Sequence, residues 1–109
     1  MSTLLYTVEA SFTDSAVAAE WIAWLRDGHL AEVMQGGALD ATVVRIDTPG
    51  EATTLCRVHY RFASREAFAR YERDFAPALR ADGVARFPTS RGIEYRRSTG
   101  LIEVSLPPA

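Results

Sequence analysis

The segment Leu55–Phe62 alternates apolar with charged or titratable side chains at every second residue. Its apolar positions are Cys56, Val58, Tyr60 and Phe62, and its polar positions are Arg57, His59 and Arg61. The segment Leu4–Phe12 repeats the alternation, with Tyr6, Val8, Ala10 and Phe12 on one side and Thr7, Glu9 and Ser11 on the other. A period of two residues is the side-chain spacing of a β-strand. The chain is therefore expected to build a sheet in which two strands each have one buried and one polar face.

The rest of the chain predicts two more strands and two helical regions. The strands are expected at Ala41–Asp47, with Thr42, Val44 and Ile46 on one side, and at Gly92–Ser98, with Ile93 and Tyr95 on the apolar side. The first helix follows a cap at Thr13 or Asp14 and ends at Gly28, and a short turn of His29–Gln35 closes at Gly36 and Gly37. The second helix follows a cap at Ser64, has the apolar stripe Phe68, Tyr71 and Phe75, breaks at Pro77 and stops at Gly83. The tail, residues 100–109, has room for a short extra strand before its prolines.

The order of these elements is strand, helix, strand, strand, helix, strand. Right-handed crossovers assemble this order into an α+β, ferredoxin-like βαββαβ sandwich, in which helices back a four-stranded antiparallel sheet. In this topology the first and third strands are central neighbours. Because the chain has 109 residues and no internal repeat or linker, we expect a single domain, residues 1–109.

Charge and composition exclude several kinds of partner and site. The chain has 14 acidic and 12 basic residues, a net charge of −2 and no basic run, so we do not expect it to bind nucleic acid. No apolar run approaches the ~18 residues of a membrane span, and the N-terminus lacks a secretory signal, so we expect no membrane partner and a cytoplasmic location. Two histidines and one cysteine give no recognised metal-ligand spacing, and no nucleotide fingerprint is present, so we expect no metal and no cofactor. Cys56 is expected to be buried and inert.

The polar faces of the two central strands lie side by side, away from the helices. They bring together Thr7, Glu9, Arg57, His59 and Arg61, and Arg45 and Arg96 are expected to join them from the edge strands. One interpretation is a face exposed to water, which is common in antiparallel sheets. The other is a homodimer in which two such faces pack together. There, Glu9, Asp47 and Glu94 would pair with the arginines, and Leu5, Val43 and Leu55 would supply apolar contacts.

Four segments carry a family resemblance: LLYTVEASF, WIAWLRDGHLAEVM, VHYRFASREAFARYERDFAPALR and ARFP. Together they resemble an uncharacterised bacterial family of the dimeric α/β-barrel superfamily, over nearly the whole chain. The most specific parts are the spacing of Trp21, Trp24 and His29 and the segment Tyr71–Leu79 with its Ala76-Pro77 pair. The resemblance implies a homodimer. It implies no particular reaction, because the wider superfamily includes cofactor-free monooxygenases, isomerases, cyclases, haem-degrading enzymes and members without known activity.

His29 is the strongest candidate for chemistry. It follows Gly28, at the expected mouth between helix and sheet, where an imidazole that titrates at about 6.5 can act as a general base near neutral pH. The structural alternative is that His29 caps the short helix or bonds a carbonyl at the corner. Either role is compatible with the sequence.

Five aromatic residues are candidates for ligand contact: Trp21, Trp24, Tyr6, Tyr60 and Tyr95. All three tyrosines fall on the helix-facing side of their strands, where a buried hydroxyl needs a hydrogen-bond partner. They therefore either reach the rim or line a partly polar pocket with the two tryptophans. Two tryptophans three residues apart on a helix are, by themselves, more often core residues than a surface that binds a ligand.

These patterns favour a protein that binds a small hydrophobic or aromatic ligand in the cleft between helices and sheet. A second hypothesis is a cofactor-free monooxygenase or isomerase, with His29 as base and a tyrosine donating to the developing oxyanion. A third is a structural or interaction module without a ligand. An open cleft favours the first two hypotheses and a filled core the third.

Overall fold

The computed structural model describes residues 2–107. Its strands are β1 (Leu4–Phe12), β2 (Ala38–Ile46), β3 (Thr54–Phe62) and β4 (Ile93–Leu101), and its helices are α1 (Ser15–Trp24), α2 (Leu30–Gln35), α3 (Arg65–Asp74) and α4 (Ala76–Arg86). A π-helical turn, Leu25–His29, joins α1 to α2, and a 3₁₀ turn, Thr89–Arg91, precedes β4.

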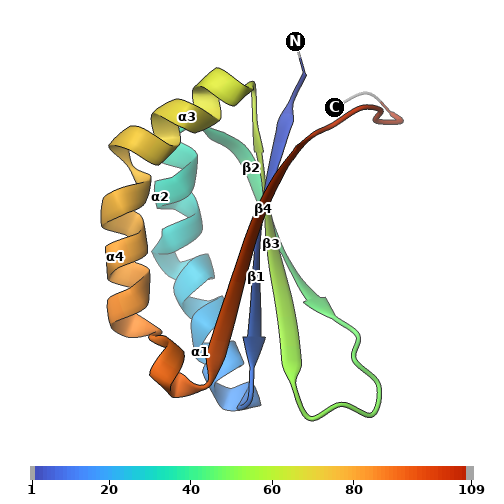
Figure 1. Ribbon diagram of the computed structural model, residues 1–109, viewed down its shortest axis with the longest axis vertical. Coiled ribbons are helices and arrows are strands. Elements are labelled where there is room, and N and C mark those ends of the chain that lie inside the picture. The colour runs from blue at the N-terminus through green and yellow to red at the C-terminus, as the bar shows by residue number, and fades with distance from the viewer. Residues whose placement is uncertain (1, 108–109) are drawn as a thin grey trace.

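The four strands form one antiparallel sheet in the order β2-β3-β1-β4. All four helices lie against one face of the sheet, and the opposite face is bare (Figure 1). We call these the covered face and the open face. The predicted ferredoxin-like α+β fold, with the first and third strands at the centre, is confirmed.

The register of the central strands sets the two faces. Tyr6 lies opposite Tyr60, Val8 opposite Val58 and Ala10 opposite Cys56, all on the covered face. The most deeply buried strand residues belong to this face, and Ala10, Phe12, Cys56 and Phe62 are each 0% exposed. The burial predicted for Cys56 is therefore confirmed. Helices begin where the sequence predicted: Asp14 accepts a hydrogen bond from the Ala16 N–H (2.9 Å), and the Ser64 hydroxyl oxygen accepts one from the Ala67 N–H (3.1 Å).

Two glycines expected to end helices do not do so. Gly28 lies inside the continuous helical run from α1 to α2, which passes it as a kinked π-helical turn. Gly83 lies within α4, and a Cβ atom there would be 3.4 Å from the Trp24 ring. Gly83 therefore allows α4 to approach the indole closely, which is a packing role rather than a stop signal. Phe75, expected in the buried stripe, is 38% exposed because it lies at the junction of α3 and α4.

The predicted faces of β2 are wrong. The strand begins at Ala38 rather than Ala41, and a bulge at Leu39 shifts its register against β3. Val43 consequently lies opposite Val58, and Arg45 opposite Cys56, so both belong to the covered face. Thr42, Val44 and Ile46 occupy the open face instead. The predicted segment starts after the bulge, and its two sides both carry valine or isoleucine, so the alternation alone did not show which side faces the helices.

The C-terminal part of the chain also differs from expectation. β4 runs from Ile93 to Leu101, three residues further than predicted, and the described tail to residue 107 forms no extra strand. The Ile102 N–H donates to the Thr3 carbonyl oxygen (2.9 Å), which prolongs the pairing with β1 by one bond. Residues 108 and 109 lie outside the described part. Gly92 precedes β4 with a φ of 81°, and a Cβ there would lie 2.1 Å from the Thr13 hydroxyl oxygen, so only glycine fits.

Candidate functional site

A cavity of about 60 Å³ lies between the covered face and the helices. Its aromatic lining is Tyr6, Trp21, Trp24, Tyr60, Tyr71 and Tyr95. Its aliphatic lining is Val8, Leu25, Val58, Leu79 and Val84, together with Gly83, and its titratable or charged lining is His29, Arg80 and Arg97. Every ligand-contact candidate from the sequence, and His29, thus lies around one cavity, so the core is not completely filled. That these residues bind a ligand remains a prediction.

The two tryptophans have different surroundings, although only three residues separate them on α1. Trp21 is 3% exposed and packs against Phe12, with ring centroids 5.4 Å apart. Trp24 is half-buried, lies 5.4 Å from the Phe87 ring and stacks on His29 at 4.1 Å. Trp21 is therefore a core residue that also borders the cavity, whereas Trp24 is part of its wall.

His29 packs flat against the Trp24 indole, at an interplanar angle of 23°. Its side chain makes no capping hydrogen bond to α2, so the capping interpretation is wrong. Burial lowers the pKa of His29 from 6.5 to about 4, against the opposing effect of the nearby Asp82 carboxylate. The imidazole is therefore neutral at pH 7, and it is a much weaker base than the unperturbed group on which the sequence hypothesis depended.

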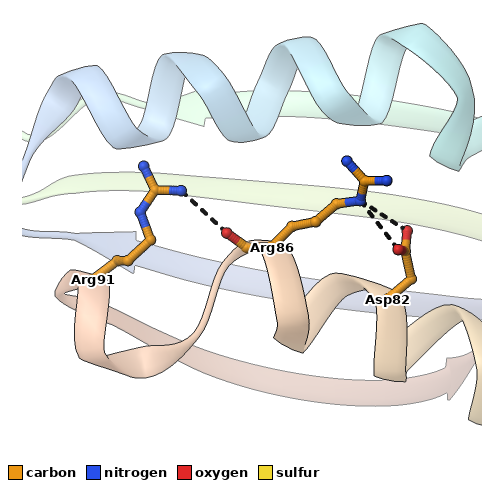
Figure 2. A network of polar contacts seen from close by, with 3 residues as sticks. All are labelled: Asp82, Arg86 and Arg91. Carbon is orange, nitrogen blue, oxygen red and sulfur yellow. Dashed lines mark hydrogen bonds and ion pairs between the residues drawn. The ribbon is translucent and has the colours of Figure 1, made fainter.

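Asp82 stabilises a charged His29 only weakly because its carboxylate already has a partner. The Arg86 Nε donates to both Asp82 carboxylate oxygens, at 3.1 and 3.2 Å, as Figure 2 shows. In the same figure, Arg91 reaches back to the Arg86 carbonyl oxygen, at 3.1 Å. This network at the C-terminal end of α4 holds the nearest carboxylate in an ion pair.

The cavity tyrosines differ in whether their hydroxyls are already bonded. The Tyr6 hydroxyl oxygen accepts from Arg80 (3.3 Å), and the Tyr95 hydroxyl donates to the Phe87 carbonyl oxygen (2.8 Å). Within residues 2–107 we find no such bond for Tyr60 or Tyr71, and no enclosed side-chain polar atom there lacks a partner, so their hydroxyls open onto the cavity. Burial raises the pKa of Tyr60, and it raises the pKa of Tyr71 to about 12. Both are therefore neutral phenols that can donate a hydrogen bond.

Three cavity residues with polar or charged groups were not recognised as site candidates from the sequence: Tyr71, Arg80 and Arg97. Tyr71 was assigned to the apolar stripe of its helix, and Arg80 follows the predicted break at Pro77. Arg97 is two residues after Tyr95 on β4, and its guanidinium carbon lies 5.7 Å from the Tyr95 ring centroid. The alternation that placed Tyr95 on the covered face therefore contained the signal for Arg97.

The open face brings together the predicted dimer-face residues Glu9, Arg57, His59 and Arg61. The Arg57 Nε donates to a Glu9 carboxylate oxygen (2.9 Å), and the Thr7 hydroxyl lies 3.1 Å from the His59 Nδ1. Arg61 pairs with Asp40 at 2.7 Å, whereas Asp47, one of the three acids named from the sequence, lies beyond the end of β2. Arg96 joins this face opposite Glu9, but Arg45 does not. The half-buried apolar residues of the face are Leu5, Val44, Ile46 and Leu55.

Residues 2–107 contain no group of three or more His, Cys, Asp or Glu side chains positioned to hold a metal ion. Over the same residues, no helix has the length and hydropathy needed to cross a membrane.

Several solved structures share this fold. A dimeric ferredoxin-like protein from an uncultured marine organism matches with a TM-score of 0.71 and 15% identity, over 96% of this chain and 99% of that one. A second dimeric ferredoxin-like protein from an uncultured marine organism matches with a TM-score of 0.64 and 7% identity, over 94% and 96%. A variant of SnoaB, a cofactor-independent oxygenase from Streptomyces nogalater, matches with a TM-score of 0.66 and 15% identity, over 96% of this chain and 98% of that one. At these identities the likeness establishes the fold.

No curated protein matches the chain. The model of the family described as "Domain of unknown function (DUF4286)" matches residues 3–97, which is most of the sequence. This match agrees with the resemblance to an uncharacterised family.

Proposed function

We propose that this chain, which belongs to the family DUF4286, binds a small aromatic molecule in the cavity between its helices and its sheet. One observation carries the proposal: aromatic side chains from β1, α1, β3, α3 and β4 converge on a single cavity. The walls are apolar, and the Tyr60 and Tyr71 hydroxyls open onto the interior. A mainly apolar pocket with a few convergent polar groups is typical of small-molecule sites.

The volume of the cavity limits the size of the ligand. About 60 Å³ is well below the roughly 300–1,000 Å³ of sites for drug-sized molecules. It is also smaller than the roughly 150 Å³ of an engineered cavity that holds benzene. The ligand is therefore a single-ring molecule, and the cavity widens to admit it. Val84, which is 58% exposed, can move aside without disturbing the core.

We also propose that a second copy of the chain covers the open face. Glu9 and Asp40 alternate there with arginines, so that two copies of the face can exchange ion pairs across a two-fold axis. The four half-buried apolar residues of the open face supply the contact that excludes water. Two structures with the same fold are of dimeric proteins, which supports this arrangement.

A catalytic role is the second candidate. The shared fold of a cofactor-independent oxygenase favours it, as does a neutral imidazole at the cavity wall. The low pKa of His29 argues against strong general-base catalysis, because proton transfer to a base of pKa about 4 has little driving force at neutral pH. Oxygen uptake with a dihydroxybenzene, measured for the wild type and for His29→Ala, tests this role. Uptake that depends on His29 would favour the enzyme over the binding protein.

The binding proposal is tested with benzamide, a neutral single-ring probe, by ligand-observed nuclear magnetic resonance and by the fluorescence of Trp21 and Trp24. We expect saturable binding to the wild type. Val84→Phe places a ring at the cavity mouth and should weaken binding at least fivefold. Ala85→Phe, the next residue on α4 and not part of the lining, is the matched control and should bind as the wild type does. Absence of saturable binding, or equal loss in both variants, would contradict the proposal.

The dimer proposal is tested by light scattering at tens of micromolar protein. We expect about twice the chain mass of 12.0 kDa. Val44→Glu, on the open face, should give the mass of a single chain, whereas Val84→Glu, on α4, should not change the mass. A wild-type protein with the mass of one chain would eliminate the second copy as the cover of the open face.

A further inference from the structure

We infer that the ligand of the cavity is an aromatic acid and that Arg97 binds its carboxylate. This inference rests on the proposed function, since it assigns a chemical class to a ligand that the cavity must first be shown to bind. It depends on the position of Arg97, on the charges around the cavity and on the size of the cavity.

Arg97 lies at the end of the row of side chains that forms the cavity floor. On the covered face it is directly opposite Val8 on β1, and Val8 is opposite Val58 on β3. All three residues line the cavity. Because β4 is the edge strand, a flat molecule lying over the two valines would have one end against the Arg97 guanidinium, and this end would also be next to solvent. The row therefore provides an apolar surface for a ring and a cation for a charged substituent.

The charges around the cavity are not balanced. Its lining contains Arg80 and Arg97 and no acidic residue. Arg80 already donates to Glu72, at 2.6 Å, and to the Tyr6 hydroxyl oxygen, at 3.3 Å. Within residues 2–107 we find no carboxylate in an ion pair with Arg97, whose guanidinium lies over the Tyr95 ring. The positive charge at the mouth that is available to a ligand is therefore that of Arg97.

Size and geometry favour a carboxylate over a larger anion. A guanidinium presents two parallel N–H donors that match the two oxygens of a carboxylate. One available arginine balances one negative charge, and a cavity that must already widen to admit a ring favours a small, planar anionic group over a bulkier one. The Tyr60 and Tyr71 hydroxyls, which are neutral donors at the interior, are compatible with further polar substituents on the ring.

Arg96 provides a matched control because it is the next residue on the same strand and has the same charge. It lies opposite Glu9 on the open face, whereas Arg97 lies opposite Val8 on the covered face. Both side chains are exposed, and replacing either with glutamine removes one positive charge from the same part of the sheet edge. Any effect of overall charge should therefore be equal in the two variants.

The experiment compares benzoate with the neutral isostere benzamide by isothermal titration calorimetry on the full chain. We expect the wild type to bind benzoate at least threefold more tightly than benzamide, with a preference that falls as salt is added. Arg97→Gln should abolish the preference, because the affinity for benzoate should fall to that for benzamide. Arg96→Gln should keep it.

Each alternative outcome identifies what has failed. If benzamide binds as well as benzoate, the cavity binds aromatic rings without selecting acids, so the inference is overturned and the proposed function stands. If neither probe binds, the proposed function fails. Equal loss of the preference in both variants would assign it to overall charge. Loss of benzamide binding in a folded Arg97→Gln protein would mean that Arg97 maintains the shape of the cavity. Either of these last two results would overturn the inference.

Discussion

The covered and open faces of the sheet are built from the same strands, yet they hold the molecule together in different ways. On the covered face, residues such as Phe12 and Phe62 are completely buried in contact with the helices. On the open face, Arg57 pairs with Glu9 and His59 lies against Thr7, and all four side chains remain half-exposed. Apolar burial stabilises by about 25 cal/mol per Å², whereas exposed ion pairs contribute about 0–1 kcal/mol each. We therefore expect stability to depend on the covered face and recognition on the open face and the cavity mouth.

Thiol reactivity should separate the two faces most strongly. The native Cys56 thiol should react with a thiol reagent on the order of a thousandfold more slowly than in the unfolded chain, because it is 0% exposed and burial raises its pKa. Ser11→Cys, made together with Cys56→Ala, places the thiol on the open face instead. It should react quickly in dilute protein and more slowly as concentration rises and a second copy covers it. Rapid labelling of native Cys56 would contradict the comparison.

The two tryptophans should differ in their contribution to stability. We expect Trp21→Ala to lower the free energy of unfolding by about 3–5 kcal/mol, because the indole is buried against Phe12. Trp24→Ala should cost only ~1–2 kcal/mol, because half-buried Trp24 borders a space that is already partly empty. Urea unfolding measures both values. Equal losses would mean that the cavity is filled in solution.

Acid should destabilise the protein through His29. The unfolded chain takes up a proton on this imidazole near pH 6.5, but the folded chain does so only near pH 4. The contribution of neutral His29 is therefore complete above pH 6.5 and decreases as the pH falls towards 4. Because solvent reaches part of the ring, we expect the free energy of unfolding to fall by about 2 kcal/mol over this range. His29→Gln should remove that part of the pH dependence. The measurement is the difference in free energy of unfolding between wild type and variant, taken at pH 4 and at pH 7. If this difference is the same at both pH values, the His29 imidazole is exposed to water in the folded protein.

The open-face ion pair should have the smallest effect. Glu9→Gln removes the partner of Arg57, whose side chain is 41% exposed, and should cost under about 1 kcal/mol in dilute protein. At concentrations where a dimer forms, the cost should increase, because the same charges would then be buried between two copies. A cost that does not depend on concentration would mean that water covers this face.

The sequence predicted the parts of the fold where the two faces differ most in polarity. Along β1 and β3, apolar and polar residues alternate without interruption, so the two faces and the positions of Tyr6 and Tyr60 followed directly. In β2 both sides carry valine or isoleucine, so the alternation did not show which side faces the helices. Arg45 and Val43 were consequently assigned to the wrong face.

The candidate site was only partly predictable, for a related reason. Alternation identifies a face, but it does not show which parts of that face the helices leave unfilled. Trp24 and His29 were recognised by their spacing, whereas their stacking depends on the kink at Leu25–His29. Arg80 depends on α4 continuing past Pro77 as one helix, where Gly83 permits close packing. Tertiary packing, rather than local pattern, brings these residues together.

The location of Arg96 and Arg97 on β4 has a consequence for solubility. The outer edge of β4 has backbone N–H and C=O groups with no neighbouring strand among residues 2–107, and such an edge can pair with other molecules and initiate aggregation. Consecutive residues of a strand point to opposite faces, so these two arginines put positive charge on both sides of the edge. Two copies of β4 that approached each other would bring these charges together. The arginine inferred to bind an acid therefore also protects the sheet edge, so a change that alters ligand preference at this position also weakens a barrier to self-association.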